Sequence, residues 1–180
     1  ESGKIYDFHS FHFGIREVSS AWNPGFVKGK DASFPLTTVI NGNPIFIRSA
    51  CWGGTPNIFV GRTAPGTYKK LLVLAKEANL NNIRIFGWHN PEIPEFYELC
   101  DSLGLTVWQD MIPLGSGNIP KDRKQIERVI NAGIAVAKER RNHPSLVMME
   151  GGEESFLPTR DVEFATDFLK ELGDSLQYYL

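Results

Sequence analysis

The sequence predicts an α/β fold: the first half, about four βα units, of a (β/α)8 TIM barrel, with a short β-rich lead-in. From residue 44 onward, short apolar runs alternate four times with segments of helical period. The runs are apolar on both faces, as in parallel strands covered by helices. A content of 42% apolar and 22% charged residues is typical of a folded domain.

Each unit is expected to contain a strand, a polar turn and a helix. We expect the four strands at residues 45–52, 83–86, 105–108 and 146–149. Helices are expected after the turn at 64–67, from Pro94 to Leu103, after the loop at 113–118, and after the acidic segment at 150–154. Gly104 ends the second helix as a C-cap glycine does.

A doubly wound sheet fits the same alternation. It usually carries a G-x-G-x-x-G fingerprint after its first strand, whereas this chain has Cys51-Trp52-Gly53-Gly54 there, so the barrel is favoured. Because a barrel needs eight units and about 250 residues, we interpret 41–180 as a partial barrel domain from a longer protein.

Residues 1–40 show no helical period. We expect short strands at 4–8 and 13–18, followed by a loop. This β-rich lead-in is interpreted as the end of a preceding sandwich domain, or as a hairpin that closes the bottom of the barrel.

Charge and composition exclude several classes of partner and cofactor. The 19 basic and 21 acidic residues give a net charge of −2, so we expect no nucleic-acid partner. No run reaches the roughly 18 apolar residues of a membrane span, and residues 1–18 lack the pattern of a signal peptide. The sequence leaves the cellular compartment open. Two cysteines and four histidines in unsuitable spacing predict no metal site, and we expect no cofactor.

The ends of the four predicted strands carry the candidate site. In barrel enzymes the active site lies on the loops after the strands. Here those positions hold tryptophans beside amides and carboxylates, which are typical of a sugar site because pyranose rings stack on indole. The clusters are Trp52; Trp88-His89-Asn90; Trp108 with Asp110; and Glu150 with Glu153-Glu154. We therefore expect a carbohydrate as the partner.

Several segments resemble blocks of glycoside hydrolase family 2, in the family's order. Asn41–Arg48 resembles the N-G-K-P-x-x-x-R entry into that family's barrel, and Phe13–Arg16 resembles the F-G-x-R segment that joins its immunoglobulin-like domain to the barrel. Further similar blocks are 78–84, 96–101, 107–110 and 141–145. The β-mannosidase and exo-β-glucosaminidase branch is the most similar, whereas β-galactosidases belong to the wider family.

The resemblance implies a retaining, exo-acting β-glycosidase with Glu154 as the general acid/base. Its nucleophile would follow the seventh strand, beyond Leu180, so we expect residues 1–180 alone to be inactive. Glu153 occupies the place of an asparagine that contacts the sugar 2-position in the family. A carboxylate there suits a cationic 2-amino group, because charge-assisted hydrogen bonds are strong.

Each remaining candidate has a structural alternative. The tryptophans can simply fill the barrel top, the His89-Asn90-Pro91 segment can be only a turn, and Asp110 can cap a loop. Arg84 lies inside an apolar strand and needs a partner, which favours an ion pair in the barrel lumen over substrate contact. The residues expected to bind substrate are Glu153, Trp88, His89, Asn90, Trp108, Asp110, Trp52 and Arg84.

Two other functions stay open at this point. A non-catalytic carbohydrate-binding protein fits the same scaffold, because Glu153 departs from the family pattern. An aldolase or isomerase barrel would need a strand-end lysine or a phosphate loop, which these four strands lack. Open strand edges in a half barrel also predict a homo-oligomer.

Overall fold

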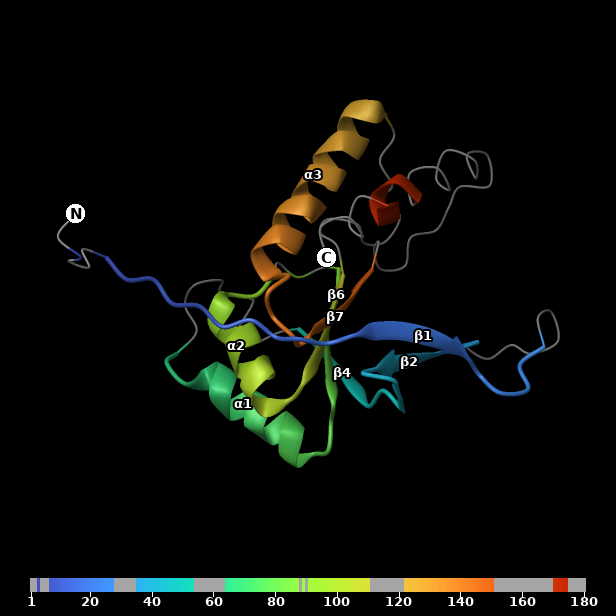
Figure 1. The fold of residues 1–180 in the computed structure, drawn as a ribbon, viewed down its shortest axis with the longest axis horizontal. Helices are drawn as coiled ribbons and strands as arrows, with labels where there is room; N and C mark the ends of the chain where they lie inside the picture. The colour runs from blue at the N-terminus through green and yellow to red at the C-terminus, as the bar shows by residue number, and fades with distance from the viewer. Residues whose placement is uncertain are drawn as a thin grey trace.

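The described part of the chain forms two sheets with helices packed beside them (Figure 1). The computed structural model describes residues 3, 7–27, 35–53, 64–87, 89, 91–110, 122–150 and 170–174. The antiparallel sheet has the order β1-β2-β3, and the parallel sheet has the order β4-β5-β6-β7. The elements are β1 (Val18–Trp22), β2 (Leu36–Ile40), β3 (Asn43–Ile45), β4 (Ser49–Trp52), α1 (Thr67–Glu77), β5 (Asn82–Ile85), α2 (Pro94–Leu103), β6 (Thr106–Asp110), α3 (Arg123–Arg140) and β7 (Leu146–Glu150).

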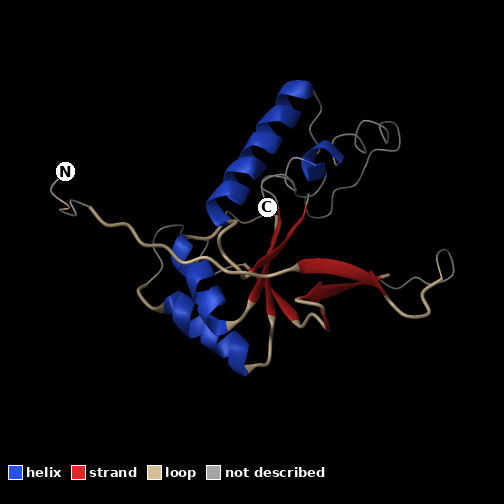
Figure 2. Ribbon diagram, viewed as in Figure 1, coloured by secondary structure: helices blue, strands red, loops and turns tan. Residues whose placement is uncertain are grey.

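The parallel sheet confirms the predicted alternation of strands and helices. Its strands follow the order of the chain, without the reversal that marks the switch point of a doubly wound sheet. All three neighbouring pairs are parallel. The helices α1 and α2 lie together on one side of this sheet (Figure 2). Consecutive parallel strands covered on one face by their helices are the arrangement of a (β/α) barrel.

The helices begin and end at local sequence signals. Pro94 opens α2, where its missing N–H is one that a first turn leaves unpaired in any case. Gly104 follows the helix with a φ of 64°, a conformation that glycine adopts without strain. Asp122 caps α3, since its carboxylate accepts a hydrogen bond from the Gln125 amide at 2.9 Å. None of the helices in the described ranges combines the length and apolarity needed to cross a bilayer.

One apolar core joins α1 and α2 to the sheet. Ile83 and Ile85 of β5 and Val107 of β6 are buried against these helices. Leu72 of α1 and Phe96 of α2 close the core from the other side and are fully buried. Each such side chain contributes about 1.5–3 kcal/mol through burial. The apolar faces predicted for these helices are therefore confirmed.

A second apolar cluster is formed by one face of α3 and Leu172. It consists of Ile126, Val129, Ile130, Ala137 and Leu172. Leu172 belongs to the helical residues 170–174, which fall within the last predicted helix. The rest of that helix lies outside the described residues.

The lead-in is rich in β-structure, but the predicted positions of its strands were wrong. Residues 7–17 form no strand, and residues 4–6 lie outside the described part. The strands are β1 and β2, of which β2 falls in a segment expected to be a loop. β2 is joined to β3 by Asn41 and Gly42, with φ values of 50° and 75°. Positive φ at both residues is what a type I′ hairpin turn requires. The antiparallel sheet thus includes residues on both sides of the expected boundary at 40–41.

The apolar run at 45–52 is divided between the two sheets, where a single strand was expected. β3 pairs with β2, whereas β4 pairs with β5. Between them, residues 46–48 bond to the turn after α1. The Asn81 side chain accepts from the Arg48 amide at 2.8 Å and donates to the Phe46 carbonyl at 2.9 Å. These bonds replace ladder bonds and let the chain pass from one sheet to the other; we call residues 46–48 the crossing.

The segment Phe13–Arg16 lies against the loop before β7. Arg16 Nε donates to the Pro144 carbonyl at 2.8 Å, and its Nη2 donates to the Leu146 carbonyl. A Cβ added at Gly14 would meet the Pro144 ring at 2.2 Å, so only glycine fits there. The lead-in is therefore tied to the last described strand by contacts about 130 residues apart in sequence.

Candidate functional site

Three charged side chains converge at the carboxyl ends of β5, β6 and β7. Arg84 donates to Asp110 through two atoms, Nε to Oδ1 at 3.1 Å and Nη2 to Oδ2 at 2.6 Å. The same Nη2 lies 3.2 Å from Oε2 of Glu150. We call these three residues the strand-end cluster. The ion pair that the sequence favoured for Arg84 is present, with two carboxylates as partners.

The two carboxylates of the strand-end cluster differ in their surroundings. Asp110 is 1% exposed, and its Oδ2 also accepts from the Gly87 amide at 3.2 Å. The contact of Glu150 with Arg84 is longer, at 3.2 Å, and the Glu150 side chain is 35% exposed. Burial raises the pKa of the Glu150 carboxyl, Asp110 raises it further, and Arg84 opposes the shift. Asp110 is thus held in place by its hydrogen bonds, whereas the more exposed Glu150 holds its proton to a higher pH than usual.

Trp108 lies beside this cluster on the same face of the sheet. The Arg84 guanidinium carbon is 4.8 Å from the centroid of the Trp108 ring, a cation–π geometry. Strand register explains the contact, since Arg84 and Trp108 are direct neighbours on β5 and β6. The indole ring of Trp108 and the two carboxylates are thus brought side by side on this face by their shared contact with Arg84.

A polar row lies on the same face nearer the amino ends of the strands. Ser49 Oγ donates to Asn82 Oδ1 at 2.6 Å, and Asn82 Nδ2 donates to Thr106 Oγ1 at 2.8 Å. The three residues come from β4, β5 and β6 in turn. This row fixes the register of the strands at the end opposite the strand-end cluster.

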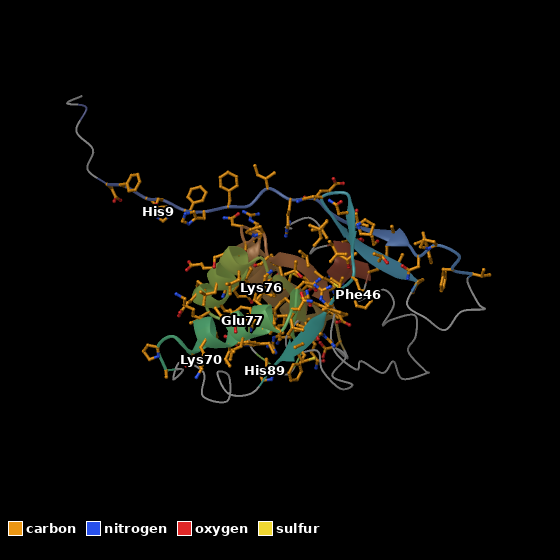
Figure 3. The ribbon with its side chains drawn as sticks, turned by 90° about the horizontal axis from the view of Figure 1, so that it is seen from below. His9, Phe46, Lys70, Lys76, Glu77 and His89 are labelled. Carbon is orange, nitrogen blue, oxygen red and sulfur yellow. The ribbon has the colours of Figure 1, made fainter. Side chains whose placement is uncertain are left out.

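A groove of about 1090 Å³ runs along this face, between the two sheets. Residues of β2 and β3 form one wall, and Asn82, Trp108 and Glu150 belong to the other. Phe46 of the crossing also lines it and lies on the side away from α1 and its Lys70 (Figure 3). The strand-end cluster is therefore reached from the groove at Glu150.

The structure places Trp52 on the opposite face of the parallel sheet. Its ring packs against Tyr68 and Phe96, with centroids 6.2 and 5.0 Å apart, and it is 9% exposed. Its indole N–H donates to Glu92 Oε1 at 2.8 Å. Trp52 is thus part of the helix-side core and is not brought together with Arg84 and Trp108.

His89 lies in the turn that follows β5. Its amide donates to the Phe86 carbonyl at 2.9 Å, and the two rings meet edge to face at 4.4 Å. Both rings lie directly against Gly53, at the end of β4. Of the predicted site, Trp88, Asn90, Glu153 and Glu154 lie outside the described residues.

No group of three or more His, Cys, Asp or Glu side chains suited to a metal occurs in the described ranges. His9 lies on the extended N-terminal segment, away from His89 (Figure 3). His143 instead bonds Asp101 of α2 at 2.6 Å. This contact gives His143 a structural role, since it joins the loop before β7 to α2.

Sequence reasoning missed Glu92, which is 3% exposed in the loop between β5 and α2. Its carboxylate accepts hydrogen bonds from Trp52 and from the Tyr68 hydroxyl, the latter at 2.7 Å. The available signal was indirect: buried Trp and Tyr side chains need partners for their polar tips. Nothing local in Pro91-Glu92-Ile93-Pro94 indicates a buried carboxylate.

Comparison with known proteins decides the family. Residues 40–177 match the family described as "Glycosyl hydrolases family 2, TIM barrel domain". The chain belongs to glycosyl hydrolase family 2. The match confirms both the resemblance found in the sequence and the assignment of the parallel sheet to a TIM barrel.

Relatives of this family 2 chain include several β-mannosidases. β-Mannosidase B of Aspergillus clavatus is 31% identical over 156 residues, covering 87% of this chain and 18% of that protein. The solved β-D-mannosidase of Dictyoglomus thermophilum is 36% identical, with a TM-score of 0.67, and the match covers 78% of this chain and 16% of that one.

A more distant likeness extends over more of the chain. The β-glucuronidase of Parabacteroides merdae matches with a TM-score of 0.70 at 20% identity, covering 93% of this chain and 19% of that one, and shows the fold alone. The family 2 chain spans less than a fifth of the length of these three relatives.

Proposed function

We propose that the complete protein is a retaining, exo-acting β-glycosidase that removes a terminal β-linked sugar, with Glu154 as its general acid/base. The observation that carries the proposal is the strand-end cluster, at the active-site face of a family 2 barrel. Glu154 follows Glu150, the last residue of β7, by four positions. A catalytic carboxylate on that loop would lie on the same face as the cluster.

Retaining hydrolysis needs two carboxylates about 5–5.5 Å apart. In the proposed mechanism Glu154 protonates the glycosidic oxygen as the bond to the leaving group breaks. A nucleophilic carboxylate, expected after the seventh strand and beyond Leu180, forms the covalent glycosyl intermediate. Glu154 then takes a proton from the water that hydrolyses it. Proton transfer and covalent catalysis by carboxylates require no cofactor.

The remaining residues of the site fall into two groups in this proposal. Trp88, His89, Asn90, Trp108 and Glu153 contact the sugar by stacking or hydrogen bonding. Arg84 and Asp110 position the site, because Asp110 is buried and already accepts three hydrogen bonds. Trp52 is left out because it packs among the helices.

A β-mannoside is the proposed substrate, supported by the names of the relatives that share more than 30% identity. A 2-amino sugar is a second candidate, and the observation that favours it is Glu153 at the position expected to face the sugar 2-position. A charge-assisted hydrogen bond from a protonated amine to this carboxylate would favour that substrate.

The test uses the complete reading frame that contains these residues. Purified protein is assayed with chromogenic β-mannoside, β-galactoside and β-glucosaminide. We expect Glu154→Gln to lower kcat by about 10²- to 10⁴-fold, which is the usual contribution of a general acid/base. Glu127→Gln, an exposed carboxylate on α3, is the matched control and should leave kcat unchanged.

Each outcome separates the alternatives. Faster hydrolysis of the glucosaminide than of the mannoside would favour the second substrate. Unchanged kcat in Glu154→Gln would contradict the assignment of the acid/base. Sugar binding measured by calorimetry without any hydrolysis would favour the non-catalytic carbohydrate-binding protein.

A further inference from the structure

Three described residues of the loop between β5 and α2 contact other parts of the protein: Gly87, His89 and Glu92. Near the start of the loop, the Gly87 amide donates to buried Asp110 at 3.2 Å. In its middle, the ring of His89, which packs on the Phe86 ring, lies against Gly53 after β4. Near its end, the Glu92 side chain enters the helix-side core. These residues flank Trp88 and Asn90 in sequence.

The second contact leaves no space between the loop and β4. A Cβ added at Gly53 would lie 2.3 Å from Phe86 Cε1 and 2.7 Å from His89 Nε2. Only a glycine at the end of β4 therefore lets these two rings approach so closely. The loop is thus packed directly on the sheet at this point.

The third contact is made by a carboxylate buried among aromatic rings. Glu92 Oε1 accepts from Trp52 at 2.8 Å, and Oε2 accepts from the Tyr68 hydroxyl at 2.7 Å. The Glu92 carbonyl also accepts from Arg140 Nη2 of α3 at 2.8 Å. Bonds from β4, α1 and α3 therefore converge on one loop residue.

The buried carboxylate of Glu92 is energetically unfavourable compared with an apolar side chain in the same place. Burying a charge costs several kcal/mol, and an apolar side chain of similar volume often stabilises a protein as well or better. The carboxylate does fix its own orientation, because the Trp52 indole and the Tyr68 hydroxyl each donate a hydrogen bond to one of its oxygens. The arrangement is therefore suited to holding the loop in one position.

We propose that Glu92 is a positioning residue for sugar binding, which holds the loop that carries Trp88, His89 and Asn90. This inference rests on the proposed function, in which these three residues contact the sugar. A loop already fixed in its bound position loses less conformational entropy when a ligand binds. Glu92 itself touches no substrate in this proposal.

The experiment compares two substitutions that each remove one hydroxyl and keep the shape of the side chain. Tyr68→Phe removes a donor to Glu92. Thr106→Val removes a hydroxyl of the polar row, which bonds Asn82 and the Asn81 carbonyl far from the loop. Both variants are made in the complete protein. Thermal stability, kcat, KM and hydrogen exchange of the loop amides are measured for each.

We expect both variants to lower the melting temperature by a few degrees. Tyr68→Phe should also raise KM roughly three- to tenfold, with kcat within about twofold of the parent. The reason is that a loop held less firmly by Glu92 loses more conformational entropy when the sugar binds. Its loop amides at 86–93 should exchange faster. Thr106→Val should change neither KM nor loop exchange. Glu92→Leu should raise KM further, and Glu92→Gln, which keeps one acceptor, should restore most of it.

Equal KM values and equal loop exchange in Tyr68→Phe and Thr106→Val would overturn the proposal, even if the protein hydrolyses glycosides well. Faster loop exchange without a change in KM would overturn it too. If the complete protein binds but does not hydrolyse, the comparison is made on the Kd for methyl β-mannoside. A protein that neither binds nor hydrolyses glycosides would overturn both this proposal and the proposed function.

Discussion

The two faces of the parallel sheet are built on different principles. On the helix side, Ile83 and Ile85 of β5 pack against Phe96 in an apolar core. On the groove side of the same strand, Arg84 pairs with Asp110 of the neighbouring strand β6 and with Glu150 of β7. Successive residues of one strand thus serve the core and the candidate site in alternation. The fold can therefore be kept while the chemistry of the other face changes.

The comparison also shows how much each face depends on single contacts. An apolar core distributes its stabilisation over many small contacts, and the loss scales with the volume removed. A charged cluster depends on pairing, so removal of one partner leaves a buried charge behind. The following substitutions probe this difference.

Phe96→Ala should have the largest effect on stability. The ring is fully buried and packs against Trp52, Tyr68 and Tyr97, so its removal leaves a cavity. We expect a loss of about 3–5 kcal/mol in the free energy of unfolding, measured by denaturant titration. Glu98→Ala, on the exposed side of the same helix, should change it by less than about 0.5 kcal/mol. Similar losses in both variants would contradict the assigned core.

Arg84→Met should lower the free energy of unfolding somewhat less, by about 3 kcal/mol. Arg84 is itself partly exposed, whereas its partner Asp110 is buried. The cause is the unpaired carboxylate, so the double variant Arg84→Met/Asp110→Asn should recover part of the loss. A double-mutant cycle on unfolding free energies measures this coupling. If the losses of unfolding free energy in the two single variants simply add in the double variant, the Arg84–Asp110 pair carries no coupling, and the groove-side face is stabilised by independent contacts as the core is.

Glu150→Gln should have the smallest effect, within about 1 kcal/mol, because a third of the side chain is exposed. The folded pKa of Glu150 lies above its ordinary value of 4.5, so its protonated form contributes stability. That contribution is fully present below about pH 4.5 and is lost as pH rises through the folded pKa. Glutamine resembles the protonated form, so the variant should be the more stable at pH 7 and the difference should vanish in acid. Thermal melts from pH 3 to 8 measure it, and a less stable variant at pH 7 would show that the ion pair with Arg84 dominates.

The helix-side face was largely predictable from the sequence. Helical period and a proline and glycine at its ends gave α2 its observed bounds, Pro94–Leu103. The β2–β3 hairpin was missed, although Asn41-Gly42 is a strong turn signal, because the segment before it was interpreted as a loop. The crossing at 46–48 was not predictable, since it depends on bonds to Asn81, more than 30 residues away.

The candidate site was predictable in part. The need of Arg84 for an anion indicated an ion pair, and adjacent strand ends supplied Asp110 and Glu150. The expected sugar contact of Trp52 was wrong, because Trp52 lies on the helix side of the sheet. Side chains alternate between the two faces of a strand, so the face that Trp52 occupies depends on where β4 begins, and the sequence did not indicate that residue. Glu92 was invisible for a related reason: its partners lie 24 and 40 residues away.

The crossing also has a consequence for the order in which the chain folds. Arg48 and Phe46 bond to Asn79 and Asn81, in the turn that α1 forms at its end. Closing a segment of 31–35 residues is slower than forming a hairpin or a helix, because its entropic cost comes before its contacts. We therefore expect the β2–β3 hairpin to form early by itself. It should dock late, after α1 and β5 have folded and the turn that holds Asn79 and Asn81 is in place.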